Sequence, residues 1–327
     1  MTIFADRSMR DQVKLSILIV SFNTREVLKE CLHSVYGAEI CYPFEIIVVD
    51  NNSHDGSAQM VKGDFPLVKV IENKENLLFA KANNQAAAVA QGEYLLLLNS
   101  DTLIEKGNIE KLINFLDRSD TRIACAGPVV VNKDKTHQSS GYALPSICER
   151  FTMVFKSNRW LPRAIARLIL PEGTPGLYTS SHKVGWIAGC CILIRKSIYQ
   201  LVGGLNEMLE FYGEEPELGW KFKTRGYETW VVSDSSIIHL GGCSTKTDSA
   251  HFLNDLDGKL YRYSQLQKYT VGYLKAIRMS QIVIIAAHIK QLLARDRETK
   301  KYFKNAIEYE KKVVDYLRNA LRNEIND

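Results

Sequence analysis

Two apolar runs in the first third of the chain each end in a carboxylate. The run Phe44–Asp50 ends in an aspartate, and the run Tyr94–Asp101 (YLLLLNSD) ends in Asn-Ser-Asp. Runs of this length are typical of strands buried on both faces of a parallel sheet, and ligands bind at the carboxyl ends of such strands. Because carboxylates bind divalent cations, we expect Asp101 to hold a metal ion. The alternative is that Asp101 caps the following helix; two strands ending in aspartate favour a site.

A second acidic segment, Phe211–Trp220 (FYGEEPELGW), lies in the latter half of the chain. It predicts a helix that begins at Glu214 and Glu215, with Pro216 in the first turn. The helix dipole favours carboxylates there, so a purely structural role for both is open. His239 ends a further apolar run and is followed by a Gly-Gly pair.

Alternating strands and helices must position these groups. The pattern predicts strands at Leu15–Val20, Phe44–Asp50, Val68–Ile71 and Tyr94–Leu98, and helices at Arg25–Tyr36, from about Ser57, and at Phe79–Gln91. This order is typical of a parallel sheet with crossover helices. Neither GxGxxG nor GxxxxGK[ST] occurs in it, which argues against a dinucleotide-binding fingerprint and a P-loop.

The alternation fades after a predicted helix at Ile109–Leu116. Strands are predicted at Ile123–Gly127, Val129–Val131 and Trp230–Val232, a strand pair or one kinked strand at Val184–Ile194, and a helix at Ser146–Leu170. Gly189 implies that backbone or ligand approaches closely. Arg159, Arg163 and Arg167 share one face of the predicted helix, as a solvated face or as a contact for an anionic acceptor or a membrane.

Composition indicates a soluble globular protein of 327 residues, with 46% hydrophobic and 24% charged residues. The length suits one large domain or two ordinary ones. Seven cysteines without a CxxC pair suggest neither a zinc site nor a disulfide framework, as expected in a reducing compartment. Residues 1–12 lack the apolar core of a signal peptide, and no stretch is expected to reach the ~20 apolar residues of a membrane span.

The basic charge belongs to the end of the chain. Lys259–Asp327 carries 15 Lys or Arg against 7 Asp or Glu, while the preceding residues are net negative. We therefore expect no nucleic-acid partner. Helices are predicted at Tyr261–Ile277, Gln281–Leu293 and Tyr302–Leu321, and an apolar stripe from Ile282 to Leu293 is followed by basic residues. These helices could pack on the body, form a homodimer, or attach peripherally to an anionic inner membrane.

Seven motifs occur in the order seen in family 2 inverting glycosyltransferases, and the chain most resembles their rhamnosyltransferase-like branch. They are Leu15–Asn23, Glu45–Ser57, Asn76–Asn84, Gly92–Thr102, Ala188–Gly204, Gly213–Tyr227 and Ile237–Ser244. The resemblance implies an α/β protein of GT-A type, a Rossmann-like αβα sandwich with a mixed, mainly parallel sheet, plus a C-terminal helical extension. The expected divisions are a tail at 1–13, a catalytic domain at 14–255 with nucleotide-binding (14–128) and acceptor-binding (129–255) halves, and the extension at 256–327.

The resemblance also assigns the site. Nucleotide-sugar binding falls to Val20, Ser21, Asn23, Asp50, Asn52, Lys81, Asn83, Asn99, Ser100 and Asp101. Asp50 resembles the carboxylate that reads the pyrimidine edge, and Asn99-Ser100-Asp101 matches a DXD-type motif with Asn at its first acidic position. Asp101 and His239 match ligands of Mg²⁺ or Mn²⁺. Glu215 falls at the catalytic base, where the family normally has Asp, and Glu214 is the alternative base.

The implied reaction is transfer of a sugar, rhamnose as the first choice, from a dTDP- or UDP-sugar to a glycan or lipid-linked acceptor in bacterial surface polysaccharide synthesis. Such chemistry needs a cation for the leaving diphosphate, a carboxylate base for the acceptor hydroxyl, and an in-line arrangement. The alternatives are a hexosyl or galactofuranosyl transferase, or a catalytically silent sugar-nucleotide-binding partner. We expect a cytoplasmic protein, or one peripheral to the inner face of the plasma membrane.

Overall fold

The computed structural model describes residues 13–144, 179–209, 213–241 and 256–326. They belong to two compact units. The first comprises residues up to Tyr142 and those from Pro175 to Thr247, and the second comprises Ala143–Thr174 and Asp248–Asp327. The predicted helix Ser146–Leu170, with its three arginines, lies outside the described residues.

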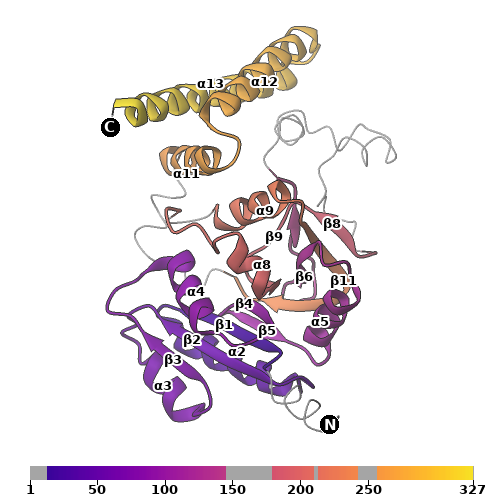
Figure 1. The fold of residues 1–327 in the computed structure, drawn as a ribbon. Helices are drawn as coiled ribbons and strands as arrows, with labels where there is room; N and C mark the ends of the chain where they lie inside the picture. Colours follow the sequence, from indigo (N-terminus) through magenta and orange to yellow (C-terminus); the bar gives the residue numbers. More distant parts are fainter. Residues whose placement is uncertain (1–12, 145–178, 210–212, 242–255, 327) are drawn as a thin grey trace. The chain divides into compact units, whose positions relative to one another are not determined.

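The first unit begins with the predicted alternation of strands and helices (Figure 1). The elements are β1 (Leu15–Ser21), α2 (Arg25–Gly37), β2 (Phe44–Asp50), α3 (Ser57–Asp64), β3 (Lys69–Glu72), α4 (Leu78–Val89) and β4 (Tyr94–Asn99). Neighbouring strands in the order β3-β2-β1-β4 are parallel. Their carboxyl ends therefore lie along one edge of the sheet.

The sheet becomes mixed beyond β4. The further elements are β5 (Thr102–Ile104), α5 (Asn108–Arg118), β6 (Ile123–Val131), β7 (Gly141–Tyr142), β8 (His182–Val184), β9 (Trp186–Ile187), β10 (Cys191–Arg195), α8 (Lys196–Leu201), α9 (Glu214–Thr224) and β11 (Glu228–His239). The sheet continues β4-β10-β6-β11-β5, with β8 on β11 and with β7 and β9 in a separate pair. β10, β5 and β8 run against the other strands. The predicted fold class, a mixed and mainly parallel sheet, is confirmed.

Several predicted boundaries are wrong in this half. Ile123–Gly127 and Val129–Val131 form one strand, β6, which runs through Pro128. Proline lacks the N–H that a ladder needs, and the register of β11 against β6 shifts directly after the pair formed by Val232 and Pro128. The residues that follow Val232 form a bulge. The predicted strand Trp230–Val232 and the apolar run that ends at His239 therefore belong to one strand, β11. Val184–Ile194 divides among β8, β9 and β10.

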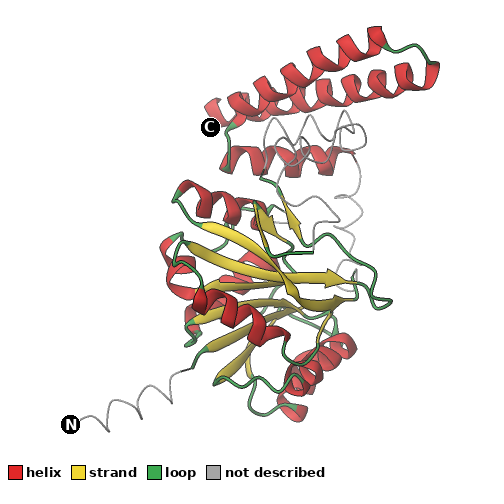
Figure 2. Ribbon diagram, turned by 90° about the vertical axis from the view of Figure 1, so that its right-hand side faces the viewer, coloured by secondary structure: helices red, strands yellow, loops and turns green. Residues whose placement is uncertain are grey.

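The apolar strand β4 is buried on both faces, as its sequence predicts. Every residue from Tyr94 to Leu98 is at most 2% exposed. Leu96 and Leu98 pack in the layer that contains α2, α3 and α5, and Leu95 and Leu97 pack in the layer that contains α4, α8 and α9. The sheet therefore lies between two helical layers, which Figure 2 shows from a second direction. This sandwich holds the carboxyl end of β4 in place.

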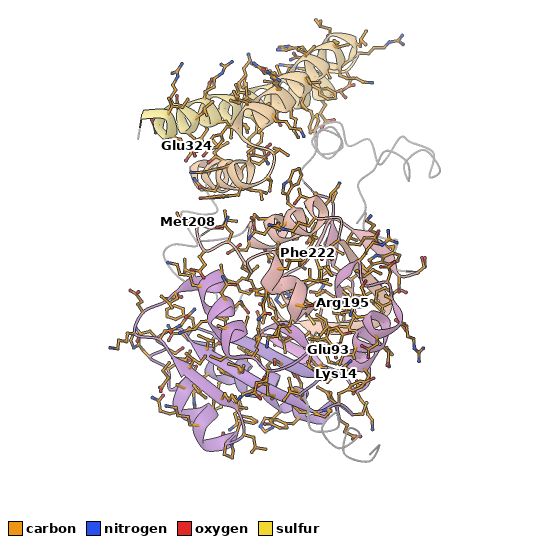
Figure 3. The ribbon with its side chains drawn as sticks, viewed as in Figure 1. Lys14, Glu93, Arg195, Met208, Phe222 and Glu324 are labelled. Atoms are coloured by element: carbon orange, nitrogen blue, oxygen red, sulfur yellow. The ribbon has the colours of Figure 1, made fainter. Side chains whose placement is uncertain are left out.

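A polar network fixes the opposite end of β4. The Tyr94 hydroxyl donates to Asp117 at 2.6 Å and accepts from Arg195 at 3.1 Å. Arg195 also donates to the carbonyl oxygen of Leu116 at 2.6 Å. Lys14 bridges Glu93 and Asp117, at 2.8 and 3.0 Å. Figure 3 labels Lys14, Glu93 and Arg195 around this end of the strand.

The described part of the second unit is helical: α11 (Leu256–Tyr269), α12 (Tyr273–Leu293) and α13 (Arg297–Asn326). α12 and α13 pack along each other through an apolar cluster that includes Ala276, Ile277, Val313 and Leu317. The predicted helix Tyr261–Ile277 is wrong, because the chain breaks at Gly272, whose φ is +81°.

One further expectation from the sequence is also wrong. Among the described helices, α12 is long and apolar enough to cross a membrane, with 21 residues and a mean hydropathy of 1.2. The length of this apolar segment was underestimated from the sequence because Lys275, Arg278 and Lys290 interrupt it. Core helices of soluble proteins pass the same test of length and composition, so this property alone does not establish a span.

Candidate active site

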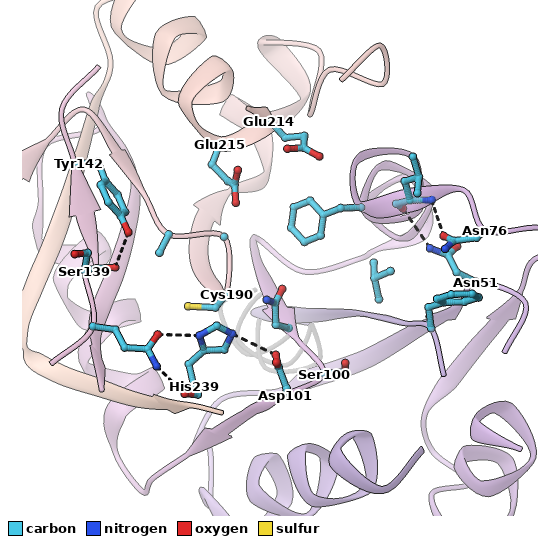
Figure 4. Close-up of a pocket in the computed structure, with 18 residues that line it drawn as sticks. Asn51, Asn76, Ser100, Asp101, Ser139, Tyr142, Cys190, Glu214, Glu215 and His239 are labelled. Atoms are coloured by element: carbon cyan, nitrogen blue, oxygen red, sulfur yellow. Dashed lines mark hydrogen bonds and ion pairs between the residues drawn. The ribbon is translucent and has the colours of Figure 1, made fainter. Parts of the chain in front are cut away.

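A cavity of about 450 Å³ lies at the carboxyl ends of β1 and β4 (Figure 4). Six residues of the predicted site line it: Val20, Asn99, Ser100, Asp101, Glu215 and His239, together with the alternative base Glu214. The structure adds lining residues that the sequence analysis did not single out: Phe22, Asn51, Asn76, Leu78, Phe79, Gln138, Ser139, Tyr142, Ala188 and Cys190. Asn76, Leu78 and Phe79 lie within a motif already recognised, whereas Gln138 and Tyr142 lie where the sequence carries no periodic signal.

Asp101 and His239 meet on one wall of the cavity. His239 ends β11 and lies opposite Thr102 of β5, and the backbone N–H of Leu240 donates to the carbonyl oxygen of Asp101 at 2.9 Å. As a result, Nε2 of His239 lies 3.3 Å from Oδ1 of Asp101. Asp101 is 3% exposed. The predicted pairing of these two residues is therefore present in the structure.

Asp101 does not cap a helix. The chain continues from Asp101 directly into β5, and the next helix, α5, begins at Asn108 with Gly107 at its N-cap. The capping alternative was wrong because the residues after Asp101 pair with β11. The carboxylate is held at the cavity wall by strand pairing.

Asp101 and His239 suit a divalent cation that takes only some of its ligands from the protein. A carboxylate oxygen and an imidazole nitrogen stand side by side, and among the described residues no group of three or more metal-binding side chains occurs. Mg²⁺ and similar ions are often bound by one or two protein groups and by substrate phosphates and water. The histidine ligand suits Mn²⁺ in addition.

Glu214 and Glu215 form another part of the wall, at the start of α9. Figure 4 shows Glu215 directed toward the space beside Cys190 and His239. The backbone N–H groups of Gly189 and of Glu215 itself lie where they favour the ionised form of the Glu215 carboxylate and lower its pKa. A Cβ atom at position 189 would lie 2.1 Å from Oε1 of Glu215. A group does approach Gly189 closely, but it is the side chain of Glu215 and not the backbone or ligand expected from the sequence.

Burial changes the acid–base behaviour of this pair. Burial and the neighbouring Glu215 raise the pKa of Glu214 to about 8. Burial also raises the pKa of Glu215, against the two backbone N–H groups that favour its ionised form. Two adjacent carboxylates in a site of low polarity resist double ionisation, so one proton is retained by the pair over a wide pH range. Such a pair can accept a proton near neutral pH.

The end of β2 supplies a further carboxylate near the cavity. Oδ2 of Asp50 accepts the backbone N–H of Ser53 at 2.9 Å, and Oδ1 is buried without a hydrogen-bond partner in the described part of the chain. Next to it, Asn51 lines the cavity and bonds to Asn73 and to the carbonyl oxygen of Leu78. A buried carboxylate oxygen without a donor is costly, so Asp50 is suited to accept one from a ligand.

Asp50 is not among the residues that line the cavity, and the remaining predicted nucleotide-binding residues do not line it either. Ser21 bonds to Thr24, which bonds in turn to Ser100 at 3.1 Å. Asn23 and Asn52 have positive φ angles in the loops after β1 and β2. A final pair lies on α4: Lys81 is exposed, and the amide of buried Asn83 donates to the carbonyl oxygen of Phe79 within the same helix.

Comparison with known proteins identifies the class to which this fold and site belong. Residues 16–202 match the profile of glycosyl transferase family 2. This match covers more than half of the chain, so the chain belongs to that family. The family predicted from the sequence motifs is therefore confirmed.

Individual relatives are more distant. The chain is 26% identical, over 64% of its length and 71% of the relative's, to N-acetylglucosaminyl-diphospho-decaprenol L-rhamnosyltransferase of Mycobacterium tuberculosis. It is 25% identical to the O-antigen biosynthesis protein RfbC of Myxococcus xanthus, over 74% of this chain and 18% of that one. Among solved structures, GalNAc-T7 with UDP, GalNAc and Mn²⁺ has a TM-score of 0.58 at 20% identity, over 94% of this chain and 57% of that one. This last likeness shows the GT-A fold.

We predict that Gly189→Ala lowers the rate of sugar transfer by roughly 10²-fold or more, because the added methyl group displaces the Glu215 carboxylate. Gly63→Ala is the matched control, since a Cβ at position 63 meets nothing within 4 Å. Transfer rates and melting temperatures of both purified variants check this prediction. A Gly189→Ala protein that transfers sugar at the rate of Gly63→Ala would show that the position of Glu215 is not needed.

Proposed function

We propose that the protein is an inverting glycosyltransferase of bacterial surface polysaccharide synthesis. It takes a sugar from a nucleoside diphosphate donor of dTDP or UDP type, with rhamnose as the first choice, and passes it to a glycan or lipid-linked acceptor. The observation that carries this proposal is the cavity, in which Asp101 and His239 lie on one side and the Glu214–Glu215 pair on another (Figure 4). The names of the two relatives, a rhamnosyltransferase and an O-antigen protein, support the choice of sugar and pathway.

The charge of the cavity supports a metal-dependent donor site. Its described lining contains three carboxylates and no Lys or Arg. A diphosphate would therefore meet no positive side chain there, so a divalent cation held by Asp101 and His239 would supply the neutralising charge. Mg²⁺ and Mn²⁺ both suit these ligands, and the GalNAc-T7 structure contains Mn²⁺ together with UDP.

The protein's own groups would then perform three tasks. Asp50, through its unpartnered Oδ1, accepts a hydrogen bond from the nucleobase. Asp101 and His239 would hold the cation that neutralises the diphosphate end of the donor. Glu215 removes the proton from the acceptor hydroxyl as this oxygen attacks the anomeric carbon, and the bond to the diphosphate breaks on the opposite face, which inverts the configuration.

Glu215 suits the role of base better than Glu214. Two backbone N–H groups stabilise its ionised form, whereas Glu214 is 3% exposed and has a pKa of about 8. The backbone N–H groups therefore favour a charge on Glu215, and burial beside that charge favours a proton on Glu214. This division of labour gives one neutral and one ionised carboxyl group in adjacent positions.

The donor can be identified by a thermal-shift screen of nucleoside diphosphate sugars with Mg²⁺ or Mn²⁺, because a ligand of the folded state raises the melting temperature. We predict stabilisation by dTDP- or UDP-sugars that depends on the cation.

Asp50→Asn is expected to weaken binding of the free nucleoside diphosphate by about tenfold to a hundredfold in calorimetry, through loss of one charged hydrogen bond. Unchanged affinity in Asp50→Asn, with Asp55→Asn as the surface control, would contradict the role of Asp50.

We predict that Glu215→Gln lowers the transfer rate by roughly 10²–10⁴-fold while leaving donor binding intact, since it removes only the proton acceptor. In the unsubstituted protein the base must be ionised, so a raised pKa moves the loss of activity to higher pH. The rate should therefore fall, as the pH is lowered, at a pH above the ordinary pKa of 4.5 of a glutamate, because burial raises the pKa of Glu215. A rate that stays constant down to pH 5, or an active Glu215→Gln variant, would exclude this base.

We also propose a cytoplasmic protein that contacts an anionic membrane peripherally through α12, which would place it near a lipid-linked acceptor. Large apolar side chains on α12 are exposed at spacings of three, four or eight residues: Leu274, Ile282, Ile285, Ile289 and Leu292. The helix also carries Lys275, Arg278 and Lys290 and no acidic residue. An apolar stripe flanked by basic side chains suits the boundary between acyl chains and anionic headgroups.

For α12 we predict that the full-length protein co-sediments with vesicles containing phosphatidylglycerol and not with neutral vesicles. Replacing Ile285 and Ile289 by Glu should abolish this binding, whereas Ile325→Glu, at an even more exposed position of α13, should not. Light scattering of the same proteins tests whether the apolar face of α12 binds a second copy of the chain instead of a membrane. A dimer that the double substitution dissociates, without vesicle binding by the parent protein, would instead make this face a homodimer interface.

A further inference from the structure

A chain of hydrogen bonds leads from a surface turn to His239. The turn follows β6, and its backbone closes where Asn132 donates to the carbonyl oxygen of Thr136 at 2.8 Å. The side-chain amide of Asn132 donates to Oγ1 of Thr136 at 2.9 Å, and this hydroxyl donates to Asp134 at 2.5 Å. The amide of Gln138 donates to Oδ1 of Asn132 at 2.7 Å, and Oε1 of Gln138 lies 3.0 Å from Nδ1 of His239.

The orientation of the Gln138 amide is determined by a backbone group. Nε2 of Gln138 lies 2.8 Å from the carbonyl oxygen of His239, which can only accept a hydrogen bond. The atom at that position must therefore be the amide nitrogen, and the amide oxygen must face Nδ1 of His239. Since an oxygen without a proton faces Nδ1, the imidazole must carry a proton there.

In a neutral imidazole only one nitrogen carries a proton. A proton on Nδ1 leaves Nε2 with a lone pair, and Nε2 is the atom 3.3 Å from Oδ1 of Asp101. Nε2 and Oδ1 at this distance need a positive charge between them, which is either a proton on Nε2 or a metal cation that replaces this proton. We infer that Gln138 is a positioning residue that holds His239 as its Nδ1–H tautomer, so that Nε2 and Asp101 form a preorganised pair of cation ligands. This inference rests on the proposed metal-dependent function.

The direction of the hydrogen bonds strengthens this arrangement. Every donor in the chain points away from the cavity, from His239 to Gln138, Asn132, Thr136 and finally Asp134. The hydrogen bond from Thr136 lowers the pKa of Asp134, so the far end of the chain is a carboxylate. Hydrogen bonds aligned in one direction polarise one another, which increases the electron density at Nε2 of His239.

The first experiment determines the tautomer without metal or donor. Long-range ¹H–¹⁵N spectra of the full-length, metal-free protein distinguish Nδ1–H from Nε2–H imidazoles, and His239→Gln assigns the signal among the seven histidines. We expect Nδ1–H in the parent protein and loss of that preference in Gln138→Met. Gln138→Glu, which keeps an acceptor for Nδ1–H, should restore it. An Nε2–H tautomer in the parent protein, or an unchanged tautomer in Gln138→Met, would overturn the inference.

The second experiment measures Mn²⁺ affinity in the presence of nucleoside diphosphate, by electron paramagnetic resonance. We expect Gln138→Met to weaken Mn²⁺ binding by about 10- to 100-fold, as found for partners of metal-binding histidines. Thr136→Val, two links further along, should weaken it less, and Lys133→Ala, exposed in the same turn, should not change it. Equal affinities for Gln138→Met and Lys133→Ala would overturn the positioning role. Absence of Mn²⁺ binding by a parent protein with the Nδ1–H tautomer would overturn the metal dependence instead.

Discussion

The antiparallel pairing of β11 with β5 is the contact on which the site depends. It sets His239 opposite Thr102, directly after Asp101, so that two groups from distant parts of the chain approach to 3.3 Å. β11 is also paired with β6, and this second ladder holds its position along the sheet. A shift of β11 by one residue would turn His239 to the other face of the sheet. The chemistry of the cavity wall therefore follows from strand register.

The first part of the sheet, from β1 to β4, was predictable because its signals are local. β1, β2 and β4 are apolar runs with buried centres, and each ends where polar residues begin, so Asp101 could be placed at a sheet edge from the sequence alone. The second half was less predictable. Pro128 and the polar residues after Val232 resemble chain breaks, but strand pairing carries β6 and β11 through them. Gln138 lies in an irregular segment, where nothing in the sequence marks the partner of its amide.

Glu214 and Glu215 show why a structural and a functional interpretation of the same residues need not exclude each other. Their place at the start of α9 is favourable for carboxylates, which lowers the cost of burying them. Burial nevertheless raises their pKa values and brings one into a range useful for proton transfer. The sequence indicated close approach of backbone or ligand at Gly189, whereas the approaching group is the Glu215 side chain, which comes from an element that meets Gly189 only in the folded chain.

The distribution of charge links the two halves of the cavity. Asp101, Glu214 and Glu215 contribute negative charge, and the described lining contains no Lys or Arg to balance it. The charge of such a cavity repels a diphosphate and attracts a cation, so in the proposed function each of these two ligands would raise the affinity for the other. The proton that the glutamate pair retains lowers the negative charge of the cavity, and this proton is lost only as the pH rises. The burial that raises the pKa values of the proposed base pair would therefore also make the cavity more tolerant of an anionic donor.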